Sequence, residues 1–408
     1  ATRYFQEVFK KYDDLNASVQ ENINAVRVVK AYVREEYETT KFQKACNKVY
    51  EMFVRAEKLV VMNMPVMQFT VYACILGISW LGANMIVGGS LTTGELMSLL
   101  TYCMNILMSL MMLSMVFVMI TMSAASAERV AEVINETADL RDPQNPVMEV
   151  ANGSIVFDHV DFSYKKDSKE PVLKDIDLSI RAGETIGIIG GTGSAKSSLV
   201  NLISRLYDVS SGSVKVGGVD VREYHMESLR NQVAVVLQKN VLFSGTILEN
   251  LRWGNKEASE EECRRACRLA CADDFIEKMP DKYNTYIEQG GTNVSGGQKQ
   301  RLCIARALLK KPKVLILDDS TSAVDTATDA RIRRAFAEEI PETTKLIIAQ
   351  RISSIQSADR IIVMDEGRIS GFGTHEELMR TNTIYQDVYN SQIKGGGDFD
   401  ENRGGDQA

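Results

Sequence analysis

A glycine-rich run from Gly190 to Ser197 carries the clearest chemistry in this sequence. It follows an apolar segment predicted to be a strand, 185–189, and it precedes an apolar run compatible with a helix, 198–206. Strand, turn and helix in this order are typical of a loop that binds phosphate, because backbone N–H groups and a helix N-terminus attract anions. The residues expected to hold the nucleotide are Gly190, Gly191, Thr192, Gly193, Ser194, Ala195, Lys196, Ser197 and Ser198.

Two side chains of this loop have specific expected roles. Lys196 is expected to reach the outer phosphates, and the Ser197 hydroxyl is expected to ligate Mg²⁺. One residue departs from the pattern, because Ala195 stands before the lysine where Gly is usual. Taken alone, the run could also be an ordinary glycine-rich turn between a strand and a helix.

A second motif consists of the apolar run 314–317 followed by Asp318 and Asp319. A buried strand that ends in an acid is typical of a Walker B motif, in which the acid holds magnesium directly or through water. The next residue usually carries the carboxylate that orients or deprotonates the attacking water. We therefore expect Asp318 to bind Mg²⁺ and Asp319 to stand at the position of the catalytic carboxylate.

A third motif, Val294-Ser-Gly-Gly-Gln, lies between the first two. It resembles the LSGGQ signature of the ATP-binding cassette (ABC) family and differs only in Val294. A serine hydroxyl and backbone amides at a helix start suit a phosphate. In this family the signature faces ATP held by a partner domain, so the resemblance implies that two domains enclose two ATP molecules head to tail. The signature residues here are Ser295, Gly296, Gly297 and Gln298.

Further positions match the family in the expected order. Tyr164 matches the aromatic residue that stacks on adenine, and Gln238 matches the Q-loop glutamine that contacts magnesium. Asp325 matches the D-loop, in the run Ser322-Ala323-Val324-Asp325. Residues 1–127 resemble the end of the fourth transmembrane helix, the second intracellular loop and helices five and six of an ABC exporter. The resemblance covers nearly the whole chain except its tail, and it implies that the patch 25–32 is a coupling helix that docks on a nucleotide-binding domain.

Two catalytic positions differ from the family pattern. Asp319 replaces the usual Glu and has a side chain shorter by one methylene, and a misplacement of about 1 Å can cost a hundredfold in rate. Gln350 replaces the usual switch histidine, and an amide can hydrogen-bond a phosphate but cannot carry a proton as His does. Ala195 is the mildest change, tolerable if its φ is negative.

These departures predict that the chain's own site binds ATP but hydrolyses it slowly. The signature would then complete a competent site on an unlike half-transporter, as in heterodimeric bacterial exporters with one degenerate site. A homodimer with two slow sites and a nucleotide-gated protein that does not transport are the alternatives. A soluble ABC ATPase is disfavoured by the long uncharged segments. The sequence does not identify the exported substrate.

Two uncharged segments, 59–94 and 96–127, are long enough to position these motifs at a membrane. They contain 36 and 32 residues, and a spanning helix needs about 20. The short turn 88–94 joins them into a hairpin, so that both outer flanks lie on the same side of the membrane. These flanks carry the charged residues, which predicts that this side, and the nucleotide-binding domain with it, is cytoplasmic. Pro65 is expected to kink the first span or to sit in its early turns. The second span has methionines on one face, which suit either varied apolar ligands or packing against helix and lipid: Met104, Met108, Met111, Met115, Met119 and Met122.

The predicted fold is multi-domain, with an α-helical transmembrane segment of the ABC exporter type followed by an α/β P-loop ATPase domain. The expected parts are a transmembrane region over 1–127 with spans at about 59–88 and 96–123, a linker over 128–152, a nucleotide-binding domain over 153–394 and a disordered tail over 395–408. Because the chain starts without Met inside a charged helical pattern, we expect the first helices of the exporter to be missing from it.

Composition adds two limits. The 408 residues carry a formal net charge of −7, which argues against nucleic acid as a partner. The seven cysteines form no CxxC pair and are expected to be reduced. Cys263, Cys267 and Cys271 recur every four residues and are expected to share a helix face, with packing favoured over a metal site.

Overall fold

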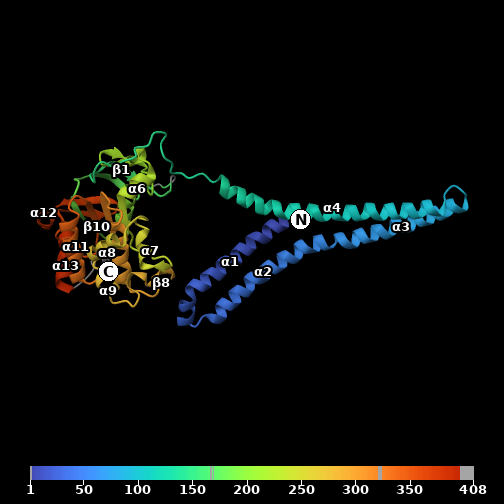
Figure 1. The fold of residues 1–408 in the computed structure, drawn as a ribbon, viewed down its shortest axis with the longest axis horizontal. Coiled ribbons are helices and arrows are strands. Elements are labelled where there is room, and N and C mark those ends of the chain that lie inside the picture. Colours follow the sequence, from blue (N-terminus) through green and yellow to red (C-terminus); the bar gives the residue numbers. More distant parts are fainter. Residues whose placement is uncertain (1, 166–167, 169, 320–323, 396–408) are drawn as a thin grey trace, which may run out of the picture. The chain divides into compact units, whose positions relative to one another are not determined.

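The computed structural model describes residues 2–165, 168, 170–319 and 324–395, and it divides the chain into two units (Figure 1). The units are Ala1–Thr137 and Ala138–Ala408. Of the tail predicted from residue 395, Gly395 is the last residue of a helix, and 396–408 lie outside the described residues.

The first unit consists of long helices. Helix α1 (Thr2–Ala31) pairs with α2 (Glu35–Val61), and α3 (Asn63–Val87) pairs with α4 (Thr93–Asn135) (Figure 1). The patch 25–32 does not form a short helix of its own. It makes up the last turns of α1, which ends in a tight turn where Val33 has φ 52°.

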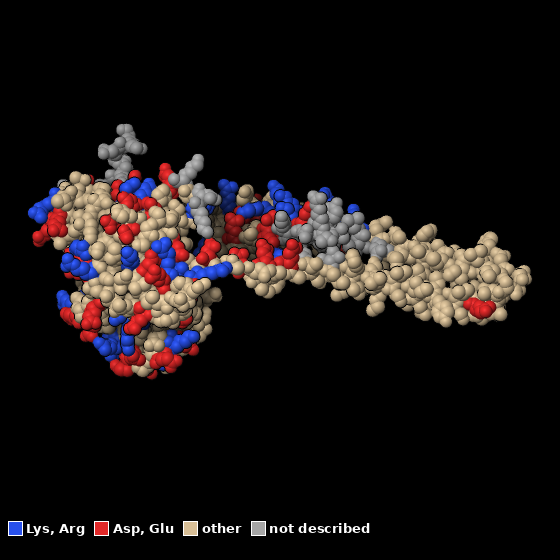
Figure 2. Space-filling model, turned by 90° about the horizontal axis from the view of Figure 1, so that it is seen from above, with Lys and Arg blue, Asp and Glu red and all other residues tan. Residues whose placement is uncertain are grey.

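The paired helices α3 and α4 contain two stretches that are long and apolar enough to cross a bilayer. These are Met64–Val87 with mean hydropathy 1.6 and Thr93–Phe117 with mean hydropathy 1.8. On the face seen in Figure 2, the surface of this pair is almost free of charged side chains. Pro65 lies in the first turn of α3, where its missing N–H removes no helical hydrogen bond.

A capping box between Thr92 and Glu95 starts α4 after the turn. The helix has 43 residues, so at about 1.5 Å per residue it extends well beyond the hydrocarbon core of a membrane. Of the six methionines predicted to share one face, Met104, Met108, Met115 and Met119 are exposed in this unit, and the side chain of Met122 lies outside the described residues. Met112, which is not in that set, is exposed as well.

The second unit contains a six-stranded sheet in the order β12-β11-β3-β10-β9-β6. Neighbouring strands from β11 to β6 pair in parallel, and only β12 pairs antiparallel. The strands are β3 (Thr185–Gly190), β6 (Val233–Val236), β9 (Val314–Asp318), β10 (Thr344–Ile348), β11 (Arg360–Asp365) and β12 (Arg368–Gly373).

A four-stranded antiparallel sheet, in the order β2-β1-β4-β5, accompanies the larger one. Its strands are β1 (Ile155–Phe162), β2 (Leu173–Ile180), β4 (Ser211–Val216) and β5 (Val219–Asp220), and a further small pair is β7 (Gly245–Thr246) with β8 (Tyr286–Ile287). The helices of this unit are α5 (Lys196–Ile203), α6 (Met226–Gln232), α7 (Ile247–Arg252), α8 (Glu260–Leu269), α9 (Asp273–Ile276), α10 (Gly296–Leu308), α11 (Thr326–Glu339), α12 (His375–Thr381) and α13 (Thr383–Gly395).

The five parallel strands of this sheet are largely buried on both faces, which explains why they are mostly apolar, whereas the edge strand β12 is partly exposed. Ile188 and Ile316 point into a core shared with the antiparallel sheet and α5. Ile189 and Leu317 point into a second core formed with the helices α7, α8, α10 and α13. The two cores fix the sheet whose strand ends carry the predicted motifs.

The three regularly spaced cysteines differ from their expected arrangement. Cys263 and Cys267 lie on α8, but the helix ends at Leu269 and Cys271 has φ 53°, so the three do not share a helix face. All three are buried in the helical core. Among the described residues, no group of three or more His, Cys, Asp and Glu side chains is placed to hold a metal ion.

Candidate functional site

Sheet topology brings four of the predicted motifs to one edge. The phosphate loop follows β3, Asp318 ends β9, and Gln350 and Gln238 lie just beyond β10 and β6. These strands are parallel, and Ile348 of β10 is in register with Asp318 on one side and with Ile188 of β3 on the other. The carboxyl ends of parallel strands are the usual place for a ligand in an α/β sheet.

The glycine-rich loop curls around the ammonium group of Lys196. The Nζ atom of Lys196 donates to the carbonyl oxygens of Gly190 at 2.7 Å and Gly191 at 2.8 Å. Gly193 has φ 84°, and a Cβ on Gly190 would lie 2.4 Å from the carbonyl oxygen of Met364. The loop therefore needs glycine at both positions, and it holds a cation where outer phosphates would lie.

The conformation of Ala195 contradicts the condition under which alanine was expected to be harmless. Its φ is 71° and its ψ is 22°, which is the left-handed region, immediately before α5 begins. An L-residue with a Cβ pays about 1–2 kcal/mol in this region, whereas Gly adopts it freely. The structure therefore predicts local strain in the loop.

Asp318 and Ser197 form a paired oxygen site beside Lys196. Asp318 is 9% exposed, and burial raises the pKa of its carboxyl, while a hydrogen bond from Ser197 and the charge of Lys196 oppose the rise. Carboxylate and hydroxyl oxygens are the ligands that Mg²⁺ prefers. The residues present therefore fit the metal ion expected to accompany a bound nucleotide.

Asp319 lies against the side chains of the two predicted glutamines. Its Oδ2 accepts a hydrogen bond from Gln350 Nε2 at 3.0 Å and a longer one from Gln238 Nε2 at 3.5 Å. The N–H of Asp319 donates to the carbonyl oxygen of Ile348 at 3.1 Å, which ties it to the end of β10. The structure thus brings the Walker B, Q-loop and switch positions into direct contact.

Tyr164 lies next to the first turn of α5. Its hydroxyl and the Ser198 Oγ are 2.8 Å apart, and its ring packs edge-on against Phe162 and Tyr207. The residue is nevertheless 51% exposed, so part of the ring is open to a ligand. Ser198 is buried and its hydroxyl is engaged with Tyr164, which places it in support of the aromatic residue.

The signature residues form the N-terminus of α10. Ser295 caps the helix, since its Oγ accepts from Gln298 N–H at 3.3 Å and its own N–H donates to Gln298 Oε1 at 2.9 Å. Gly296 is exposed and Gly297 half-buried in the first turn. Val294, the departure from the signature, is 9% exposed and packs in the helical core.

The D-loop residue Asp325 caps α11. Its Oδ1 accepts from the Thr328 N–H at 2.9 Å, and this backbone hydrogen bond is the first cause of its lowered pKa. The preceding D-loop residues Ser322 and Ala323 lie outside the described residues.

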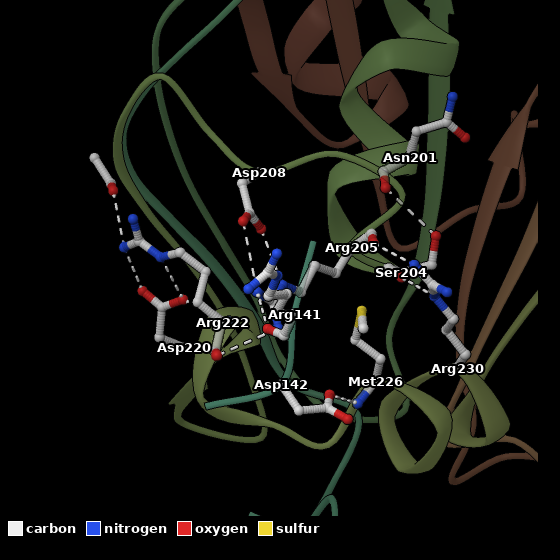
Figure 3. Close-up of polar contacts among 11 residues, drawn as sticks. Arg141, Asp142, Asn201, Ser204, Arg205, Asp208, Asp220, Arg222, Met226 and Arg230 are labelled. Carbon is white, nitrogen blue, oxygen red and sulfur yellow. Dashed lines mark hydrogen bonds and ion pairs between the residues drawn. The ribbon is translucent and has the colours of Figure 1, made fainter. Parts of the chain in front are cut away.

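Sequence reasoning missed a buried arginine at the end of the phosphate-loop helix (Figure 3). Arg205 follows α5, and its guanidinium is paired with Asp208 at 2.9 Å and donates to the carbonyl oxygens of Arg141 at 3.1 Å and Arg222 at 3.3 Å. Nearby, Asp142 accepts from the N–H of Met226 at 2.8 Å. These contacts fix residues 141–142 to α5 and α6, and in the sequence Arg205 looked like any surface arginine.

The sequence matches two families along its length. The family described as ABC transporter matches residues 173–322, and the family described as ABC transporter transmembrane region matches residues 1–111. The uncharacterized ABC transporter ATP-binding protein YfiB of Bacillus subtilis (strain 168) is 39% identical over 389 residues, which are 95% of this chain and 67% of that protein. The chain thus spans about two thirds of the length of this relative.

Two further similarities extend over both units. The ATP-dependent lipid A-core flippase of Desulfotalea psychrophila (strain LSv54 / DSM 12343) is 35% identical over 397 residues, which are 95% of this chain and 69% of the flippase. A solved structure of a bacterial Atm1-family ABC exporter with ATP bound matches this chain with a TM-score of 0.87 and 29% sequence identity. The match covers 96% of this chain and 69% of the exporter chain. These matches confirm the predicted fold class, a helical transmembrane region followed by an α/β ATP-binding domain. The chain belongs to the ABC transporter family, as an exporter-type membrane protein with a cytoplasmic nucleotide-binding domain.

Proposed function

We propose that this chain is one half of a heterodimeric exporter and that its own ATP site binds nucleotide firmly but hydrolyses it slowly. The observation that carries the proposal is the 3.0 Å hydrogen bond between Gln350 Nε2 and Asp319 Oδ2. In this hydrogen bond the carboxylate of Asp319, at the catalytic position, accepts from the side-chain amide of Gln350, and that amide has no titratable proton. Both groups that would handle the attacking water and the γ-phosphate are therefore altered.

The remaining residues of the site support binding. Lys196 is held at the loop by backbone carbonyls and can exchange these for phosphate oxygens. Ser197 and Asp318 are the residues that would hold Mg²⁺, which would neutralise phosphate charge when bound. Tyr164 offers the exposed part of its ring to adenine. This chain would therefore keep ATP as a long-lived contact between two domains.

The signature at the start of α10 is the part that would serve the partner. The N–H groups of Gly296 and Gly297 lie in the first helical turn, where unpaired backbone donors attract anions. The capping box between Ser295 and Gln298 orders this turn without a bound phosphate. Ser295 to Gln298 match the family's signature, whereas the hydrolysis site of the same chain is altered. This combination favours an unlike partner chain, whose Walker site the signature would complete.

Transport requires that nucleotide binding moves the membrane helices, and we propose the turn after α1 as the coupling element. Val28, Tyr32 and Val33 are exposed there, and Tyr32 and Val28 help line a hollow of about 530 Å³ between α1 and α2. The ATP-binding unit has a separate hollow of about 320 Å³ beside the Q-loop, in which Phe243 stacks on Trp253. Its lining combines apolar side chains with Lys239, Arg306 and Lys310, which suits an amphipathic coupling helix of the assembled exporter.

The exported substrate is proposed to be apolar or amphiphilic. The two spans expose methionines and other large apolar side chains. Relatives named as lipid A-core flippases make amphiphilic lipids the first class to test. Peptides and drugs of similar character form the second class.

Reconstitution tests the proposal. An unlike half-transporter should co-purify with this chain, and the pair in proteoliposomes should move substrate with ATP, while the pair carrying Lys196→Ala should lose ATP binding at this chain's site. Rapid ATP hydrolysis by a homodimer of this polypeptide alone would contradict the proposal of a heterodimeric exporter. Nucleotide binding without substrate movement would instead favour the nucleotide-gated alternative.

A further inference from the structure

A glutamine of the last helix holds the loop that carries the switch residue. Gln392 lies on α13, and its side-chain amide makes two hydrogen bonds to the loop that follows β10. Its Oε1 accepts from the N–H of Ile352 at 2.9 Å, and its Nε2 donates to the carbonyl oxygen of Gln350 at 2.9 Å. One amide thus uses its donor and its acceptor to bracket Arg351.

The bracketed loop connects directly to the catalytic position. The main chain of Gln350 is held by Gln392, and the side chain of Gln350 donates to Asp319 Oδ2 at 3.0 Å. A continuous chain of hydrogen bonds therefore runs from α13 through Gln350 to Asp319. No motif recognised in the sequence includes Gln392.

Burial anchors both ends of this connection. Ile352 is 1% exposed, and it lies in the same core cluster as Tyr385 and Val388 of α13. These contacts keep α13 against the base of the loop and set the position of the Gln392 side chain. Since Ile352 is buried, its N–H has little access to water if Gln392 is lost.

A second element holds the part of the loop that follows. Arg333 of α11 donates to the carbonyl oxygens of Ser353 at 3.1 Å and Ser354 at 2.8 Å, and it is paired with Asp329 at 2.9 Å. Arg333 therefore fixes the short 3₁₀ turn Ile352–Ser354. Gln392 instead holds the main chain at the start of the loop, at Gln350 and Ile352.

We propose that Gln392 is a positioning residue for the ATP site, which sets the distance between Gln350 and Asp319 by fixing the main chain of the switch loop. The inference rests on the proposed role of Gln350 beside the γ-phosphate. It makes the C-terminal helix a support of the ATP site through the switch loop. Movement of α13 would then change the nucleotide site through this one amide.

The test compares Gln392→Met with Gln386→Met in the assembled full-length transporter. Methionine keeps the length of the side chain and removes both hydrogen-bonding groups. Gln386 is the matched control, because it is half-buried on the same helix and donates to the carbonyl oxygen of Met379 at 2.8 Å rather than to the switch loop. The measurements are amide hydrogen exchange of peptides covering 349–355, and kcat and KM for ATP hydrolysed at this chain's own site, with the partner's ATP site inactivated.

For Gln392→Met we expect exchange at Ile352 to rise by about tenfold, the factor that one hydrogen bond of ordinary strength supplies. We expect kcat to fall by about threefold while KM stays within about twofold, because the phosphate and metal ligands are untouched. Gln386→Met should change neither exchange at Ile352 nor kcat. In a Gln350→Ala background, Gln392→Met should still raise exchange but should lower kcat no further.

Equal effects of the two methionine variants would overturn the proposal, because they would show a general loss of packing in α13. Unchanged exchange at Ile352 would overturn it as well, and so would a kcat loss that persists in the Gln350→Ala background. A failure of the slow-site hypothesis would appear differently, as rapid hydrolysis at this site in the unmodified chain, and it would leave the comparison of the two variants intact.

Discussion

At the scale of single residues, the phosphate loop combines a standard binding lysine with a strained neighbour. Ala195 has φ 71°, a conformation in which its Cβ is unfavourable. We predict that Ala195→Gly raises the free energy of unfolding of the nucleotide-free protein by about 1 kcal/mol. Chemical denaturation of the assembled transporter, followed through the ATP-binding unit, measures the change.

Ala182 provides the control for this substitution. It is exposed in the turn before β3 and is absent from the residues with positive φ, so Gly there should only add freedom to the unfolded chain. We expect Ala182→Gly to be neutral or slightly destabilising. If both glycine variants change stability in the same direction, the strain assigned to Ala195 is not real.

The sequence predicted which residues would surround the nucleotide, but it could not predict how they touch. Residue type and order identified Asp319, Gln350 and Gln238 separately. Their contact depends on the register of β9 against β10, in which Ile348 lies opposite Asp318. The left-handed conformation of Ala195 was equally invisible, because alanine by itself favours negative φ.

At the scale of elements, Arg205 ties the end of the phosphate-loop helix to the main chain of Arg141 (Figure 3). Its side chain is 5% exposed and its partners are Asp208 and two backbone carbonyl oxygens. We predict that Arg205→Met lowers the free energy of unfolding by about 3 kcal/mol, because it leaves a carboxylate and carbonyl groups without their donor.

Arg222 is the comparison for Arg205, because it lies in the same network but its side chain is 43% exposed. Its ion pair with Asp220 is accessible to water, so Arg222→Met should cost less than about 1 kcal/mol. Denaturant unfolding of both variants provides the measurement. If the two variants lost similar amounts of unfolding free energy, burial of Arg205 would not account for its contribution to stability.

A second element-scale prediction concerns the ion pair that joins the starts of β3 and β11. Glu184 accepts from Arg360 Nη2 at 2.6 Å and from the Arg181 N–H at 2.9 Å. Burial opposes its ionisation, but these hydrogen bonds outweigh burial and hold the pKa of Glu184 below its ordinary value of 4.5. We predict that Glu184→Gln costs about 1–2 kcal/mol of stability at pH 7.

The sign of the pH dependence follows from the lowered pKa. The stabilisation from the folded carboxylate is complete above the unfolded value of 4.5 and is lost as pH falls through the lower folded value. The difference in stability between the native chain and Glu184→Gln should therefore be constant from pH 7 to about pH 5 and should narrow below 4.5. A difference that widens on acidification would refute this assignment.

Several elements were predictable because their physical cause is local. The apolar runs of β3, β9 and β10 are buried on both faces, and the Ser295-Gln298 spacing is that of a helix cap. The end of α1 was less predictable, because amphipathic spacing alone does not show where one long helix stops. Cys271 was misplaced for the same reason, since nothing in its spacing indicates that α8 ends at Leu269.

At the scale of the whole molecule, length without charge was enough to identify the hairpin of spans, because the bilayer sets a minimum length for an apolar helix. The order of the nucleotide motifs was enough to indicate the family. The networks around Arg205 and Gln392 were not accessible, because they join segments far apart in the sequence through backbone atoms that carry no residue-specific pattern.

The central claim is that this chain's own site binds ATP and hydrolyses it slowly because of Asp319 and Gln350. The most direct measurement is hydrolysis at this site in the assembled transporter, with a photoreactive ATP analogue reporting which chain holds the nucleotide. The double variant Asp319→Glu with Gln350→His should hydrolyse ATP at this site about tenfold to a hundredfold faster than the native chain. A native site that is already fast, or a double variant with an unchanged rate, would contradict the account.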